Sequence, residues 1–242
     1  MDKLLDKSIL LVANPRTGSN YVSRILSHYL DREVLKSPFE PGDIIHAKDM
    51  SYDKLDDIVD GMLLEERYLV KVHPQQTSYR EVIQYNDIFK KFYMHDFYTI
   101  GLIRRDIFAT ALSWSISLDT GIWLPPYDYD RMEIDVESFV RQFKITLEAI
   151  DTMVNHSMID YDEVLYYEDI ESIPLDDIRL LDICPVDVES YGEIETLYKA
   201  PEKKDIVENI VELRLAVKDI SLEVNNVHIN KDMKITHIDW RT

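Results

Sequence analysis

The sequence is poor in cysteine, glycine and positive charge. It holds one cysteine, Cys184, among 242 residues, which excludes a disulfide within the chain and a metal site built from several cysteines. Only 6 glycines are present, and no Gly/Ser-rich linker, internal repeat or low-complexity tract divides the chain. With 45% hydrophobic residues there is enough apolar material for one core, so we expect a single domain over residues 1–242.

Long hydrophobic runs are also missing. No apolar run approaches the length of about 18 residues that a spanning helix needs. The first residues, MDKLLDKSILLV, carry acidic side chains and no small-residue cleavage site, so they do not resemble a secretory signal. We therefore expect a soluble cytoplasmic protein that has no membrane partner.

The charge balance is strongly acidic. The formal net charge is -19, from 46 acidic against 27 basic residues, and the resulting long-range field repels nucleic acid and anionic membranes. We therefore expect no nucleic-acid partner. A few arginines and backbone amides in a pocket can still bind a small anion, which makes clustered arginines informative.

Apolar periodicity predicts alternating strands and helices. Short apolar runs predict buried strands at 8–13, 67–72, 97–103 and 158–167. Helical spacing predicts helices directly after the first strand and near 51–65, 78–92, 106–118, 136–155 and 203–222. This alternation predicts an α/β fold with a doubly wound, mainly parallel sheet flanked by helices, in which ligands bind beyond the carboxyl ends of the strands.

The segment NPRTGSN, residues 14–20, follows the first predicted strand and precedes a helix. Pro15 stiffens the exit from the strand, Gly18 permits a left-handed or close-approach backbone, and Ser19 or Asn20 can cap the helix. Such a turn directs free N–H groups at a phosphate-like anion, and Arg16 adds a bidentate cation. An ordinary capped turn with a surface arginine is the alternative.

This turn is not a Walker A loop, because no Lys-Ser/Thr pair follows the glycine. It resembles the 5'-phosphosulfate loop of sulfotransferases, P-[RK]-[ST]-G-[ST], in a P-loop-NTPase-like fold. That family uses 3'-phosphoadenylyl sulfate (PAPS) as sulfonate donor and releases adenosine 3',5'-bisphosphate (PAP). The resemblance implies that the 5'-phosphate and sulfonate are held by Pro15, Arg16, Thr17, Gly18, Ser19 and Asn20.

A second element follows the strand at 97–103. Arg105 and Ser113 are eight residues apart, which resembles the family's 3'-phosphate element, and Arg104 is an adjacent alternative. A surface arginine pair is the ordinary interpretation of these residues. The form RRD...A.S resembles the trehalose sulfotransferase type more than the animal cytosolic type.

Two further segments bear on the resemblance. VLYYEDI at 164–170, followed by Pro174, resembles the family's Y-E-D-[LI] strand end, where Glu168 or Asp169 would cap a helix. The R-K-G segment that completes the 3'-phosphate site in cytosolic sulfotransferases has no counterpart in 175–242.

Sulfonyl transfer needs positive charge on the departing phosphate, in-line positioning and a base for the acceptor proton, and in principle no metal. Arg16 fits the first role. Lys71 and His73 lie two residues apart on one side of a predicted strand and resemble the family's K-T-H segment, whose histidine is the base. Glu40 is the alternative base, because the trehalose sulfotransferase type uses a glutamate after the first helix. A third possibility is that neither residue is the base.

The resemblance therefore predicts a PAPS-dependent sulfotransferase that acts on a hydroxyl or amine of a small-molecule or carbohydrate acceptor. Two alternatives stay open. A kinase-like phosphoryl transferase would need magnesium, and a catalytically idle nucleotide-binding protein would bind PAP without turnover.

Overall fold

A parallel five-stranded sheet is the centre of the structure, a computed structural model that describes residues 8–30, 34–35, 69–73, 97–123, 129–156, 160–171, 203–220 and 222–240. Its strands are β1 (Ile9–Ala13), β2 (Val34–Leu35), β3 (Leu69–Val72), β4 (Tyr98–Ile103) and β5 (Glu163–Tyr166). Their order across the sheet is β2-β3-β1-β4-β5, and every pairing is parallel. The sheet therefore grows outward in both directions from β1, the arrangement that leaves a ligand crevice at the carboxyl end of the central strands.

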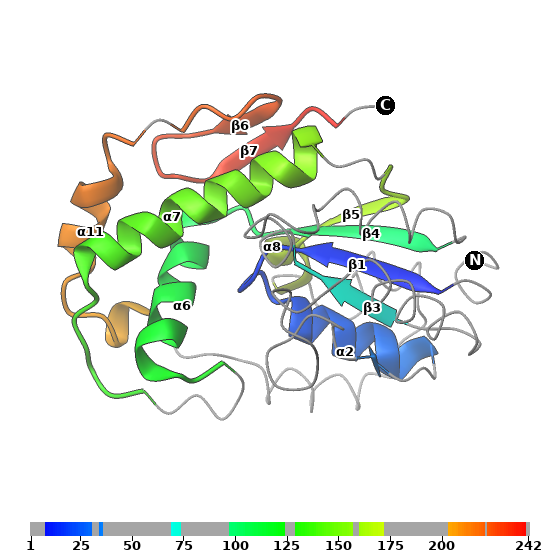
Figure 1. Cartoon of the computed structure of the whole chain (residues 1–242), viewed down its shortest axis with the longest axis horizontal. Helices are drawn as coiled ribbons and strands as arrows, with labels where there is room; N and C mark the ends of the chain where they lie inside the picture. Colours follow the sequence, from blue (N-terminus) through cyan, green and yellow to red (C-terminus); the bar gives the residue numbers. More distant parts are fainter. Residues whose placement is uncertain are drawn as a thin grey trace, which may run out of the picture.

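Strand β1 is buried along its whole length, and none of its five side chains is more than 1% exposed. A continuous apolar run of this kind is typical of a parallel strand that is covered on both faces. Helix α2 (Ser19–Leu30) follows it and packs against β1, β2 and β3. In Figure 1, α2 lies below the sheet, whereas α7 (Val136–Asp151) lies above it.

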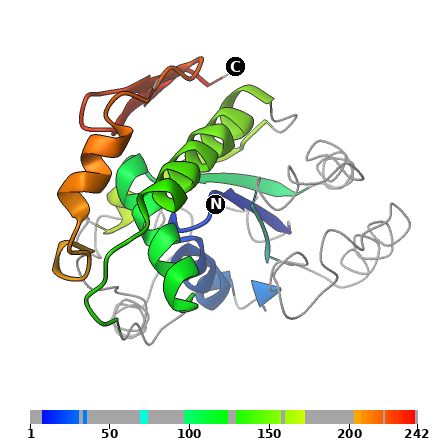
Figure 2. The ribbon, with the colours of Figure 1, turned by 60° about the vertical axis from the view of Figure 1, so that its left-hand side comes forward.

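Helices α6 (Ile107–Thr120) and α7 pack against each other and form the main core. The rings of Phe108 and Phe139 meet edge to face with centroids 5.1 Å apart, a favoured geometry for aromatic pairs. Leu10 and Val12 of β1 belong to the same buried cluster. Figure 2 shows α11 (Ile210–Val217) beside α7 at the edge of this layer.

The predicted α/β architecture, with a parallel sheet flanked by helices, is confirmed. The predicted strands at 8–13, 67–72 and 97–103 are present as β1, β3 and β4, and the one at 158–167 is shorter, at Glu163–Tyr166. The predicted helix at 106–118 is α6. The helix at 136–155 is α7, which continues as a π-helix over Thr152–His156. The predicted helices at 51–65 and 78–92 lie outside the described residues.

The prediction of one helix over 203–222 is wrong. The chain forms a 3-10 turn at Lys203–Asp205 and then leaves helical geometry before α11 begins. The reason is a strand-like contact with Met132, whose N–H donates to the Ile206 carbonyl and whose carbonyl accepts from the Glu208 N–H, both at 2.9 Å. These hydrogen bonds replace the ones that a continuous helix would make.

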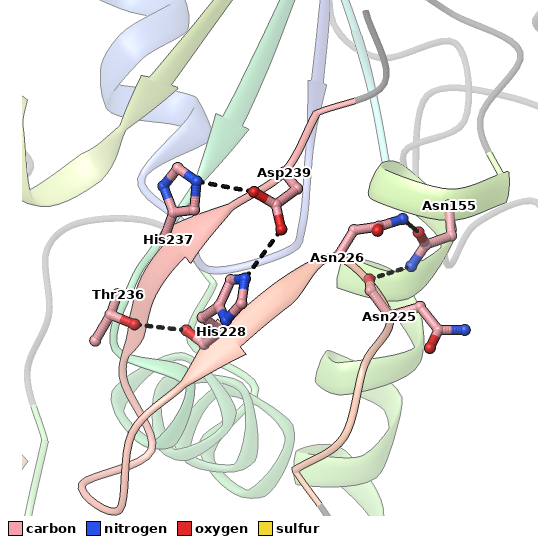
Figure 3. Close-up of polar contacts among 7 residues, drawn as sticks. All are labelled: Asn155, Asn225, Asn226, His228, Thr236, His237 and Asp239. Carbon is pink, nitrogen blue, oxygen red and sulfur yellow. Dashed lines mark hydrogen bonds and ion pairs between the residues drawn. The ribbon is translucent and has the colours of Figure 1, made fainter.

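A C-terminal hairpin is one element that the apolar pattern does not predict, and the short strand β2 is another. Strands β6 (Val227–Ile229) and β7 (Ile235–Ile238) pair antiparallel, with His228 opposite His237. Figure 3 shows that each of these imidazoles contacts a different oxygen of Asp239 through Nε2, at 3.0 Å. Strand β7 begins beside the start of α6, where the Ile235 N–H donates to the Arg105 carbonyl at 2.9 Å.

Asn155, in the π-helix that continues α7, fixes the chain just before the hairpin (Figure 3). Its amide nitrogen donates to the Asn225 carbonyl at 2.7 Å, and its carbonyl oxygen accepts from the Asn226 amide at 2.6 Å.

Among the helices that the structure describes, none combines the length and the apolarity that crossing a membrane requires.

We expect Asn155→Ala to lower the free energy of unfolding by about 1–3 kcal/mol, because it leaves partners of a buried amide unsatisfied. Asn225→Ala is the matched control, since the exposed Asn225 contributes only its backbone carbonyl to this contact and should change stability by less than about 0.5 kcal/mol. Urea denaturation followed by circular dichroism measures both. Equal effects would contradict the anchoring role of Asn155.

Candidate functional site

The backbone of the turn between β1 and α2 departs from ordinary strand and helix geometry. Gly18 has φ 80° and Arg16 has φ 65°, so two residues of this short turn are left-handed. Thr17 closes the turn by donating from Oγ1 to the Asn14 carbonyl at 2.6 Å. The Gly18 carbonyl accepts from the Val22 N–H at 3.0 Å, which begins the helix and leaves its first N–H groups without acceptors inside the helix.

The left-handed backbone predicted for Gly18 is confirmed, and the alternative reason for glycine, a close approach of another segment, is present as well. A Cβ atom on Gly18 would lie 2.3 Å from two ring carbons of Tyr167. Tyr167 opens the short helix α8 (Tyr167–Glu171) directly after β5. The turn after β1 is therefore in direct contact with an aromatic ring that follows β5, which lies two strands away in the sheet.

The Arg16 side chain joins the turn to helix α6. Its Nε donates to Ser113 Oγ at 3.2 Å, and its Nη1 donates to the Trp123 carbonyl at 2.8 Å. Arg16 and Ser113 are 97 residues apart in sequence, and both were candidate donor-binding residues on sequence grounds. The left-handed φ of Arg16 and its contact with Trp123 were missed, because no local signal marks either one.

Lys71 and His73 lie beside this turn, at the end of β3. Both side chains are buried, at 5% and 7% exposure. The Lys71 ammonium donates to the side-chain oxygen of Asn20 on the first turn of α2. Asn20 is thus held by a cation, and a lysine charge is placed next to the N-terminus of α2.

His73 is neutral in this environment. Its Nδ1 lies 2.6 Å from the Ala13 carbonyl, and because a carbonyl only accepts, Nδ1 carries the proton and Nε2 is left as the acceptor. Burial lowers the pKa of His73 to about 3, helped by the positive charges of Lys71 and Arg16. With this low pKa, Nε2 can accept a proton but is a weak base at neutral pH.

Arg104 and Arg105, at the end of β4, take different partners. Arg105 forms an ion pair with Asp169, in which Nη2 and Oδ2 are 2.8 Å apart, and its guanidinium lies 4.0 Å from the ring centre of Tyr166. The Arg104 guanidinium lies 4.8 Å from the ring centre of Tyr167, the ring that contacts Gly18.

Glu168 and Asp169 fix the junction between β4 and α6. Glu168 accepts from the N–H groups of Arg105 and Asp106, at 2.9 and 3.0 Å. Asp106 in turn caps α6 by accepting from the Ala109 N–H at 2.7 Å. The expectation that Glu168 or Asp169 caps a helix therefore needs correction, because Glu168 holds the residues before α6 and Asp169 pairs with an arginine.

The structure thus brings together most of the residues that the sequence singled out. At or just beyond the carboxyl ends of β1, β3 and β4 lie Pro15, Arg16, Thr17, Gly18, Ser19, Asn20, Lys71, His73, Arg104 and Arg105, whereas Ser113 lies in α6 and contacts Arg16. Glu40, the alternative base, lies outside the described residues. Within the described ranges no group of three or more His, Cys, Asp or Glu side chains is arranged to hold a metal ion.

Comparisons with protein families, curated proteins and solved structures do not show to which family the chain belongs. No family model matches the sequence, and no curated protein matches it. Among solved structures, mouse sulfotransferase SULT7A1 complexed with PAP aligns with a TM-score of 0.39 and 13% identity, over 89% of this chain and 67% of that one. A similarity this low does not establish a common fold.

We expect Gly18→Ala to destabilise the protein more than Gly121→Ala. Both glycines have a positive φ, but a Cβ on Gly121 has nothing within 4 Å, whereas one on Gly18 overlaps the Tyr167 ring. Gly121→Ala should therefore show only the backbone cost, about 1–2 kcal/mol, and Gly18→Ala that cost plus the clash. Thermal unfolding compares them, and an equal loss would contradict the close packing at Gly18.

Because the His73 imidazole is buried in its neutral form, we expect the protein to lose stability in acid. The unfolded imidazole has a pKa near 6.5 and the folded one about 3, so between these values only the unfolded chain binds the proton. The stabilising contribution is therefore present above about pH 6.5 and falls as the pH falls, by about 2 kcal/mol between pH 7 and pH 5.

Urea denaturation at both pH values measures this contribution against His73→Asn, in which it should vanish. His156→Asn, a change at an exposed histidine, is the control and should keep it. If His73→Asn shows the same pH dependence as the parent, the imidazole is not buried in its neutral form.

Proposed function

We propose that this protein is a PAPS-dependent sulfotransferase, which moves a sulfonate group from PAPS to a hydroxyl or amine of a small-molecule or carbohydrate acceptor. One observation carries the proposal. The turn after the central strand β1 is left-handed at Arg16 and Gly18, and it meets the N-terminus of α2 where other cationic side chains gather. A helix N-terminus with a left-handed loop and nearby cations is a phosphate- or sulfonate-binding arrangement.

The local charge supports an anionic ligand. The whole chain carries a net charge of -19, yet the carboxyl end of β1, β3 and β4 carries four cationic side chains: Arg16, Lys71, Arg104 and Arg105. Of these, Arg105 is paired with Asp169. Arg16 binds the neutral oxygens of Ser113 and Trp123. An anion would be a better acceptor for these donors than the neutral oxygens are.

The residue types favour a phosphosulfate over a magnesium-bound triphosphate. Ser19 and Asn20 follow Gly18, where a Walker A loop has a lysine and a magnesium-binding hydroxyl. The cation of this turn is instead Arg16, which precedes the glycine and acts through its charge, because an arginine does not donate its proton to a leaving group. We assign Arg16 to the phosphate–sulfonate bridge, and Ser113 with Arg104 or Arg105 to the 3'-phosphate.

The transfer step balances without a metal. The acceptor oxygen forms a bond to sulfur, the bond between sulfur and the phosphate oxygen breaks, and PAP leaves with the electron pair while a base takes the acceptor proton. We assign this proton to Nε2 of His73, whose Nδ1–H is held by Ala13. A bound anion next to Lys71 and Arg16 would offset the charges that lower the pKa of His73. Glu40 is the alternative base.

A second candidate function is a nucleotide-binding protein without turnover. It is favoured by the same histidine, because a base with a pKa of about 3 captures a proton inefficiently. This candidate shares the donor site with the first and differs only in the fate of PAPS.

Calorimetric titration with PAP in EDTA, compared with ATP plus magnesium, tests the proposed donor site. We expect micromolar or tighter binding of PAP without metal, and binding weaker by at least about tenfold, or 1.4 kcal/mol, in Arg16→Ala. Leu118→Ala, a change at an exposed apolar residue of α6, is the control and should bind like the parent. A preference for Mg-ATP would favour a phosphoryl transferase and would contradict the proposal.

A further inference from the structure

We infer that the loop of the C-terminal hairpin, residues 230–234 between β6 and β7, positions the segment that carries the proposed 3'-phosphate site. The inference deepens the proposed function and rests on it, because that function assigns Ser113 and an arginine after β4 to the 3'-phosphate. In this role the loop acts through the backbone of residues 105–107, which joins β4 to α6, and does not contact the ligand.

The hairpin loop completes the N-terminus of α6. The Ile107 N–H has no acceptor inside the helix, and it donates to the Met233 carbonyl at 3.1 Å. The Asp106 side chain caps the same turn by accepting from the Ala109 N–H at 2.7 Å. Two separate acceptors, one before the helix and one in the hairpin, therefore define where α6 begins. Ser113 lies further along this helix, so its position depends on both.

The same end of the hairpin holds Arg105. The Ile235 N–H, at the start of β7, donates to the Arg105 carbonyl at 2.9 Å, and Asp106 forms an antiparallel bridge with Lys234. The N–H groups of Arg105 and Asp106 donate to Glu168, at 2.9 and 3.0 Å. The backbone between β4 and α6 is thus held by the hairpin and by Glu168, two segments that are distant from it in sequence.

The hairpin loop is itself held in one conformation. The Asn230 side-chain oxygen accepts from the N–H groups of Asp232 and Lys234, at 2.9 and 3.0 Å, a local contact typical of asparagine in turns. Met233 has φ 61° and a buried side chain, and a residue other than glycine keeps such a backbone only where its surroundings fix it. The fixed backbone directs the Met233 carbonyl to the Ile107 N–H.

The other end of the hairpin is fastened by different contacts. Trp240, after β7, meets Tyr161 edge to face with ring centres 5.5 Å apart. Tyr161 covers Gly101 of β4, where a Cβ would lie 3.1 Å from the Tyr161 ring. Asn155 holds the chain before β6. The contacts at the two ends of the hairpin share no residue, so a substitution can weaken one end and leave the other intact.

The test measures binding to Asn230→Ala by calorimetry, with PAP and with inorganic pyrophosphate as separate probes. We expect weaker PAP binding by roughly 3- to 30-fold, the range for a residue that acts on a ligand without contacting it. Pyrophosphate lacks the 3'-phosphate and needs only the turn after β1, so its dissociation constant should stay within about twofold. Asn230→Asp keeps an acceptor oxygen and should restore PAP binding.

Asn155→Ala is the control that separates positioning from stability. It loosens the other end of the hairpin and should lower the unfolding temperature, but the PAP dissociation constant should stay within about twofold of the parent value. A loop that served stability alone would change PAP binding in neither variant, because calorimetry well below the unfolding temperature measures folded protein.

Three results would overturn the inference, and two of them leave the proposed function intact. The first is parental PAP binding in Asn230→Ala. The second is equally weakened PAP binding in Asn230→Ala and Asn155→Ala, which would assign the effect to the hairpin as a whole and not to its loop. The third is a parent protein that does not bind PAP, in which case the proposed function fails and the inference fails with it.

Discussion

The contact between Gly18 and the Tyr167 ring is the constraint on which the candidate site depends. It joins the turn after β1 to the end of β5, across the whole width of β4, and it leaves no room for a side chain at Gly18. With the turn fixed in this way, Arg16 extends to Ser113 and α2 begins at a defined point. The Arg104 guanidinium stacks on the same ring. One close approach between distant segments therefore positions both Arg16 and Arg104.

Under the proposed function, charge at this end of the sheet would couple ligand binding to the base strength of His73. Burial together with the charges of Lys71 and Arg16 lowers the pKa of His73 to about 3. An anion that neutralises these charges also removes part of what holds the pKa of His73 down. The imidazole would then become a stronger base only when the donor is bound. Asp169 pairs with Arg105 and so offsets one of the positive charges at this end of the sheet.

Much of this arrangement follows from local sequence. Continuous apolar runs predict the parallel strands, and a single glycine between a strand and a helix predicts the left-handed turn at Gly18. What the sequence does not reveal depends on contacts between distant segments. The C-terminal hairpin is short and rich in polar side chains, so it gives no apolar signal. The break before α11 is caused by Met132, and the different partners of Arg104 and Arg105 depend on Tyr167 and Asp169, more than sixty residues away.

The most direct test of sulfonate transfer is to follow radiolabelled sulfonate from PAPS into a pool of small hydroxyl and amine compounds, in EDTA. The account predicts a labelled product that appears together with an equal amount of PAP, and that is lost in Arg16→Ala. If the protein binds PAP but transfers label to no compound in the pool, the proposed sulfotransferase activity is contradicted. The protein would then be one that binds the nucleotide without turnover.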